Sequence, residues 1–132
     1  MTSELGMRAV LNVPFDEAIE KTTLALKAEG FGVLTRIDMQ STLKEKINVD
    51  FRPYMILGAC NPPLAHRALS ANADVGLLLP CNVTVQEHGG EISVSAVDPE
   101  QMLGVVGADP AISAVAAEVK TKLGRVIASL KN

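Results

Sequence analysis

The pattern of apolar and polar positions predicts a strand followed by a helix at the start of the chain. Residues 7–13 have the apolar content of a strand. After Pro14, apolar residues recur every three or four positions from Phe15 to Leu26, which is the spacing of a helix with one buried face. Gly30 is well placed to end this helix, because glycine readily adopts the left-handed conformation found after many helix C-termini.

Three further elements are predicted in the middle of the chain. Residues 31–37 are expected to form a second strand, and Asp38 is suited to cap a short helix that ends near Ile47. Residues 54–59 form a nearly unbroken apolar run. A run of this kind predicts a strand that is covered on both faces.

A pair of turn residues introduces the next helix, and a hairpin follows it. Asn61 is a favoured N-cap residue and Pro62 suits the first helical position, so a helix is predicted over residues 62–70. Residues 82–87 and 91–97 flank the turn His88-Gly89-Gly90. This arrangement is the clearest hairpin signal in the chain.

Two Asp-Pro steps predict the remaining helices. Asp98-Pro99 opens a short helical turn that ends near Met102, and Asp109-Pro110 opens a long final helix. The expected order is strand, helix, strand, helix, strand, helix, strand, strand, helix, helix, with no linker in between. The sequence therefore predicts one α+β domain over residues 1–132, with helices packed on a five-stranded mixed, largely antiparallel sheet.

Composition and charge exclude several classes of protein. The 132 residues are 48% hydrophobic, which is enough for a core without a disulfide or metal. The net charge is -3 and the basic residues are scattered, so no nucleic-acid partner is expected. No apolar stretch approaches the roughly 20 residues that span a bilayer, and the first residues lack the apolar core of a signal peptide. We therefore expect a cytoplasmic protein with no membrane contact and with reduced thiols.

The most distinctive chemistry of the chain lies in two Cys-Asn steps, Cys60-Asn61 and Cys81-Asn82. Cys60 is predicted at the end of a strand, just before a helix N-terminus, where free N–H groups and the helix dipole favour a thiolate. One hypothesis is that all four residues line one pocket that binds a small ligand or performs thiol chemistry. The alternative is an interaction or structural module in which both cysteines are buried core residues.

Other sites have weaker support. His66 and His88 do not have the spacing from the cysteines that a zinc site requires, so no metal site is predicted. Arg52 and Tyr54 are further candidate ligand-binding residues, since they and nearby lysines are placed to converge on an anion. No nucleophile–base pair is evident, and the sequence leaves open whether the domain catalyses a reaction, which cofactor it takes and which ligand it binds.

Three segments carry a family resemblance: residues 43–54, residues 56–62 and residues 78–83. Together they make the chain similar to the bacterial and archaeal family called domain of unknown function 302. The resemblance implies an α+β fold that is usually a homodimer, and it implies no particular activity. The family signature corresponds here to Phe51, Arg52, Tyr54, Gly58, Cys60, Asn61, Pro62, Pro80, Cys81 and Asn82.

Overall fold

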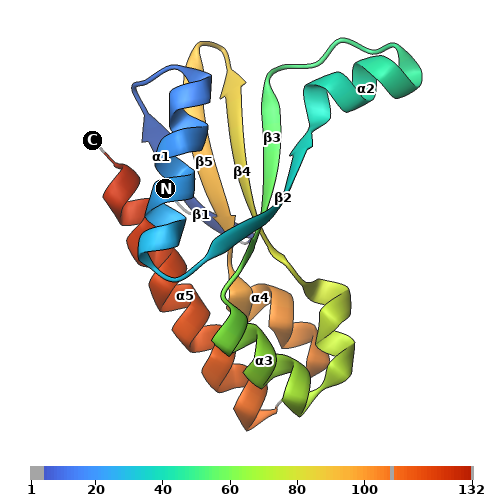
Figure 1. Ribbon diagram of the computed structural model, residues 1–132, viewed down its shortest axis with the longest axis vertical. Helices are drawn as coiled ribbons and strands as arrows, with labels where there is room; N and C mark the ends of the chain where they lie inside the picture. The colour runs from blue at the N-terminus through green and yellow to red at the C-terminus, as the bar shows by residue number, and fades with distance from the viewer. Residues whose placement is uncertain (1–4, 108, 132) are drawn as a thin grey trace.

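The protein is built on one five-stranded sheet, as the computed structural model in Figure 1 shows; it describes residues 5–107 and 109–131. The spatial order of the strands is β1-β5-β4-β3-β2, and each neighbouring pair is antiparallel. The predicted five strands and α+β class are thereby confirmed. The strands are β1 (Gly6–Leu11), β2 (Gly32–Asp38), β3 (Tyr54–Cys60), β4 (Cys81–His88) and β5 (Glu91–Val97).

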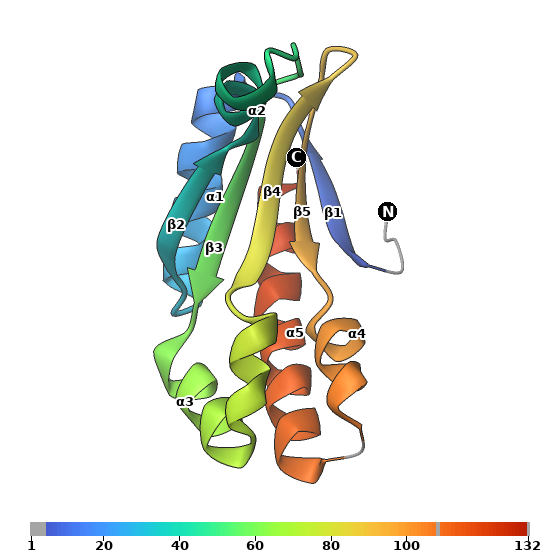
Figure 2. The ribbon, with the colours of Figure 1, turned by 90° about the vertical axis from the view of Figure 1, so that its right-hand side faces the viewer.

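Two helices, α1 (Phe15–Ala28) and α5 (Pro110–Leu130), cover one face of the sheet. Figure 2 shows both behind the strands. The buried residues of α5 recur at three- and four-residue intervals along its whole length, as the sequence pattern predicts. They pack against the inward-facing residues of the strands, such as Val83, Val85 and Val94, which are fully buried. The hydrophobic core therefore lies between the sheet and this helical layer.

No described helix covers the middle of the opposite face, and this corrects one expectation about β3. The run at residues 54–59 was predicted to be covered on both sides, but only alternate residues of β3 face the helices. Leu57 and Ala59 are buried, whereas Tyr54 and Ile56 on the outer face are half-exposed. Ile56 lies between Ile37 of β2 and Thr84 of β4. The apolar run therefore reflects an outer face that is itself partly apolar.

A group of short helices closes one end of the sheet. It consists of α3 (Pro62–Ala71), a 3-10 helix (Ala73–Leu78), α4 (Pro99–Leu103) and a second 3-10 turn (Gly104–Val106). All of them lie near the N-terminal half of α5 in Figure 2. The Asx side chains predicted as caps do cap these helices: Asn61 accepts from the Leu64 N–H, and Asp98 from the Glu100 N–H. The 3-10 helix was not foreseen from the sequence.

The helix α2 (Met39–Ile47) stands at the far end of the sheet and buries none of its residues. It begins as predicted, with Asp38 accepting from the Ser41 N–H. Figure 1 shows it projecting beyond the strands, joined to β2 and β3. Gly30, at the end of α1, has a φ of 87°, which confirms its predicted left-handed conformation. Among the residues that the structure describes, no helix is long and apolar enough to cross a membrane.

Candidate functional site

A cavity of about 310 Å³ lies where β3 ends and β4 begins, between the sheet and the group of short helices. We call it the end pocket. None of the described side chains that line it carries a charge. They come from the start of β2, the junctions of β3 and β4 with their neighbours, α3, the 3-10 helix, α4 and α5: Phe31, Leu34, Ala59, Cys60, Asn61, Leu64, Ala65, Ala68, Leu69, Gly76, Leu79, Pro80, Cys81, Pro99, Leu103, Val115 and Val119.

Both cysteines line the end pocket. Cys60 is the last residue of β3 and is half-buried, whereas Cys81 is the first residue of β4 and is buried. Neither forms a disulfide. Burial, with a smaller contribution from the charge of Cys60, raises the pKa of the Cys81 thiol to about 11. Cys81 is therefore protonated at neutral pH, and in that form it is a poor nucleophile.

Asn61 also lines the end pocket, but both ends of its amide already have protein partners. Its Oδ1 accepts from the Leu64 N–H at 3.4 Å, which caps α3. Its Nδ2 donates to the carbonyl oxygen of Glu29 at 3.4 Å. Both bonds are long, near the limit for a hydrogen bond. Asn61 therefore serves first to hold the wall of the pocket together.

Asn82 lies apart from the other three residues of the two Cys-Asn steps. It follows Cys81 in β4, so its side chain faces the opposite side of the sheet, where it is exposed and does not line the end pocket. The strand continues past Cys81, whereas at Cys60 the strand ends and a helix begins. This difference explains why two similar sequence steps place their asparagines in different surroundings.

Arg52 and Tyr54 are found at the other end of β3 from the two cysteines. The Nε of Arg52 donates to Gln86 Oε1 at 2.8 Å, and its guanidinium lies 4.4 Å from the centre of the Phe51 ring. Tyr54 is opposite Gln86 in the β3–β4 register. The candidate residues thus form two groups, one at each end of β3, and only Cys60, Asn61 and Cys81 belong to the pocket.

Gly58 of β3 lies where the structure leaves no room for a side chain. A Cβ at this position would lie 2.9 Å from Pro80 Cγ and would also collide with Thr35 Oγ1. The absence of a side chain lets Thr35 and Pro80 approach the strand closely. Because Pro80 is itself a wall of the end pocket, Gly58 helps to set the position of that wall.

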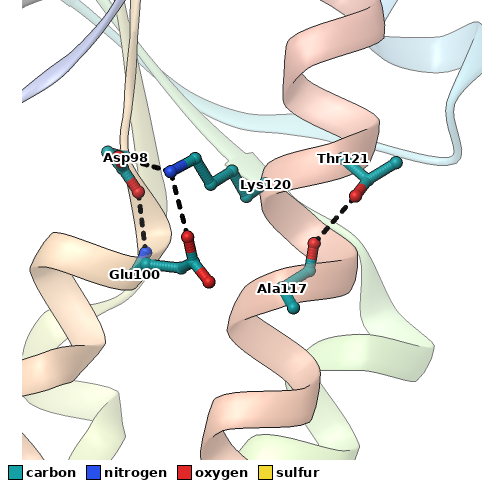
Figure 3. A network of polar contacts seen from close by, with 5 residues as sticks. All are labelled: Asp98, Glu100, Ala117, Lys120 and Thr121. Carbon is teal, nitrogen blue, oxygen red and sulfur yellow. Dashed lines mark hydrogen bonds and ion pairs between the residues drawn. The ribbon is translucent and has the colours of Figure 1, made fainter.

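A polar cluster outside the cavity fastens two of its walls to each other. Lys120 of α5 lies 2.9 Å from Glu100 Oε1 and 3.1 Å from Asp98 Oδ2, both at the start of α4 (Figure 3). The hydrogen bond to Glu100, followed by that to Asp98, raises the pKa of Lys120. The same Asp98 side chain caps α4. This cluster holds α4 against α5, next to the pocket residues Leu103 and Val119.

The long-range walls of the end pocket were missed by the sequence reasoning. Leu34, Leu103 and Val115 belong to no motif in the sequence, and they lie together only because the chain folds. The histidines lie elsewhere: both His66 and His88 are exposed. Within residues 5–107 and 109–131, no three His, Cys, Asp or Glu side chains gather in a way that could hold a metal ion. The pocket can offer a ligand apolar contacts, two thiols and the amide of Asn61.

The fold and the site define a small α+β domain with an uncharged pocket at one end of an antiparallel sheet. The chain belongs to the family described as Domain of unknown function DUF302, whose pattern matches residues 7–130. It is similar to a crystal structure of an uncharacterized conserved protein DUF302 from Bacillus stearothermophilus, with 32% sequence identity and a TM-score of 0.90. That match covers 98% of this chain and 100% of the other. No curated protein matches the chain.

Proposed function

We propose that the domain binds a small, largely apolar molecule in the end pocket. The observation that carries the proposal is the cavity of about 310 Å³ with no charged side chain on its described wall. Pockets for small molecules start near 300 Å³ and are lined mainly by apolar side chains with a few polar groups. Here the polar groups are the thiols of Cys60 and Cys81 and the amide of Asn61. They suit a ligand with one weakly polar edge and no formal charge.

Two variants of α3 provide a matched test of this proposal. Ala65 lines the end pocket and is half-buried, whereas Ala71, in the last turn of the same helix, is exposed and lies outside the pocket. Replacing either by Leu adds the same volume, and Ala and Leu have similar helix propensities. Ala65→Leu should fill part of the cavity, and Ala71→Leu should leave it unchanged.

The probe is indole, a neutral aromatic molecule, titrated into the protein and followed by chemical shifts of the pocket amides. Saturable binding that is lost in Ala65→Leu and kept in Ala71→Leu is the expected result. Thermal melts of both variants establish that they are folded. If indole gives no saturable shifts, or if both variants bind it equally well, the end pocket is not a binding site for this class of molecule.

We also propose that the domain works in the cytoplasm, where thiols are kept reduced. The support for this location is that both cysteines of the chain are free and that one of them is half-exposed in the pocket. An oxidising compartment would expose Cys60 to continuous modification. Cell fractionation with a tagged copy in a bacterial host tests the location directly, and recovery from the periplasm or the medium would contradict it.

We also infer a second function, self-association, from the part of the fold that buries least. β2 is at the end of the strand order, and α2 beside it has no buried residue. Leu34 and Ile37 of β2, which are 67% and 44% exposed, add apolar surface there. A second copy of the chain is a suitable partner, because two β2 edges can pair about a two-fold axis. Self-association corresponds to the alternative in which the domain is an interaction module. That alternative expected both cysteines to be buried in the core, whereas only Cys81 is buried.

Sedimentation equilibrium tests the homodimer with another matched pair. Ile37→Lys places a charge on the inferred interface. Leu24→Lys places one on α1, away from that interface, at a side chain that is 67% exposed. The wild type and Leu24→Lys should sediment as dimers, and Ile37→Lys should sediment as a monomer. A monomeric wild type, or an Ile37→Lys variant that remains dimeric, would rule out this interface.

A further inference from the structure

The two cysteines of the end pocket lie on neighbouring strands at the same end of the sheet. In the β3–β4 register, Cys81 is directly opposite Ala59, and Cys60 is the next residue along β3. Residues directly opposite in antiparallel strands have Cα atoms about 4.5–5.5 Å apart, and each residue advances about 3.4 Å. The Cα atoms of Cys60 and Cys81 are therefore about 6 Å apart, within the range of about 4.4–6.8 Å found for disulfides.

Side-chain direction is the second requirement for a bridge. Consecutive residues of a regular strand face opposite sides, and on that ground Cys60 and Cys81 would diverge. Each of them, however, is the terminal residue of its strand, where the chain turns away from the sheet. Both contact the same end pocket. Formation of the bridge therefore requires one strand end to move. Neither end is held by further strand pairing beyond these residues, although Cys60 itself is paired with Gly32 of β2.

We propose that Cys60 and Cys81 form a reversible disulfide across the end pocket, which makes this site a thiol–disulfide switch. The half-buried Cys60 is the thiol that reacts first, and the buried Cys81 resolves the intermediate. This goes beyond ligand binding and does not depend on it. The bridge joins the end of β3 to the start of β4 and encloses α3 and the 3-10 helix in one covalent loop.

The oxidant is a small disulfide of the glutathione type. The Cys60 thiolate attacks one sulfur of the oxidant, which forms a mixed disulfide and releases one glutathione thiolate. That thiolate accepts the proton of Cys81. The sulfur of Cys81 then attacks Cys60 Sγ and expels the second glutathione as a thiolate. This second thiolate becomes a thiol by taking up the proton that Cys60 lost at the start. In total, two protein thiols are oxidised to one disulfide and one glutathione disulfide is reduced to two thiols. The high pKa of Cys81 makes the second step the slower one at neutral pH.

The test is the intact mass of the folded, reduced protein after anaerobic incubation with glutathione disulfide and an acid quench. The expected product has lost the mass of two hydrogens, and dithiothreitol restores the original mass. Peptide mapping without reductant should join Cys60 to Cys81 within one chain. A protein that shows no reaction while folded, that stops at a glutathione adduct, or that forms only bridges between chains would overturn the proposal.

Two single variants assign the order of the thiols. Cys81→Ser should stop at a glutathione adduct on Cys60, because no resolving thiol remains. Cys60→Ser should form an adduct at least about tenfold more slowly, since access and thiolate character both limit a buried thiol. The reverse ranking would overturn the assigned order. If Cys81→Ser fails to fold, Cys81→Ala takes its place, because it adds no polar group to the buried site. The wild-type measurement by itself decides whether the bridge forms.

Discussion

The Nδ2 of Asn61 donates to the carbonyl oxygen of Glu29 at 3.4 Å, and this contact joins the start of α3 to the residue that follows α1. The two segments are far apart in the sequence. The other end of the same amide caps α3 through the Leu64 N–H. Asn61 also comes directly after Cys60, the half-buried thiol at the end of β3. Its side chain therefore connects α1, α3 and the end of β3.

Variants of Asn61 should separate its two hydrogen bonds. Asn61→Ala removes both, and the loss of an N-cap alone costs about 0.5–2 kcal/mol. We expect the free energy of unfolding to fall by about 1–2 kcal/mol in urea titrations. Asn61→Ser keeps an N-cap acceptor but is too short to reach Glu29, so it should cost clearly less. Equal losses for the two variants would show that the cap contributes nothing at this position.

Glycine positions in neighbouring strands offer a second prediction. Gly58→Ala brings a Cβ to 2.9 Å from Pro80 Cγ, and it also collides with Thr35, so we expect a loss of about 1–3 kcal/mol in the free energy of unfolding. Gly32→Ala in β2 is the matched control, because a Cβ there has no atom within 4 Å. Its effect should stay within about 0.5 kcal/mol. Urea unfolding of both variants checks the contrast, which would disappear if the close approach at Gly58 relaxed without cost.

The sequence predicts the elements of this fold much better than it predicts the pocket. Local signals mark the helix starts: Asn61-Pro62 and Asp98-Pro99 each combine a capping side chain with a proline, and both open helices. The walls of the end pocket are a different matter. Leu34 and Val115 come from distant segments, and no local pattern indicates that they meet. At Asn82 a local pattern was misleading. The repeated Cys-Asn step suggested one shared site, but side chains alternate along β4, and Asn82 faces away from the pocket that Cys81 lines.

The polar cluster that joins α4 to α5 gives a third prediction. Asp98 has two roles, because it caps α4 and pairs with Lys120 at 3.1 Å, whereas Lys120 has only its pairing with Asp98 and Glu100. Asp98→Ala should therefore lower the free energy of unfolding by about 1 kcal/mol through the lost cap. Lys120→Met should cost less, because exposed ion pairs contribute little. Chemical denaturation ranks the two variants, and a greater loss in Lys120→Met would contradict this order.

The buried thiol of Cys81 should make stability depend on alkaline pH. The folded state holds its proton up to a pKa of about 11, whereas an ordinary thiol has a value of 9.0. Because the folded-state value is raised, its contribution to stability is fully present below about pH 9 and is lost as the pH rises to about 11. Each pKa unit corresponds to about 1.4 kcal/mol, so the loss over this window should reach about 2–3 kcal/mol. Urea titrations across that range measure this loss.

Cys81→Ala removes the thiol, so the stability difference between the wild type and this variant should narrow as the pH rises. Cys60→Ala should keep most of the wild-type slope, because burial, the main cause of the shift, remains. A wild-type advantage over Cys81→Ala that stays constant with pH would mean that Cys81 ionises as easily in the folded protein as in the unfolded chain.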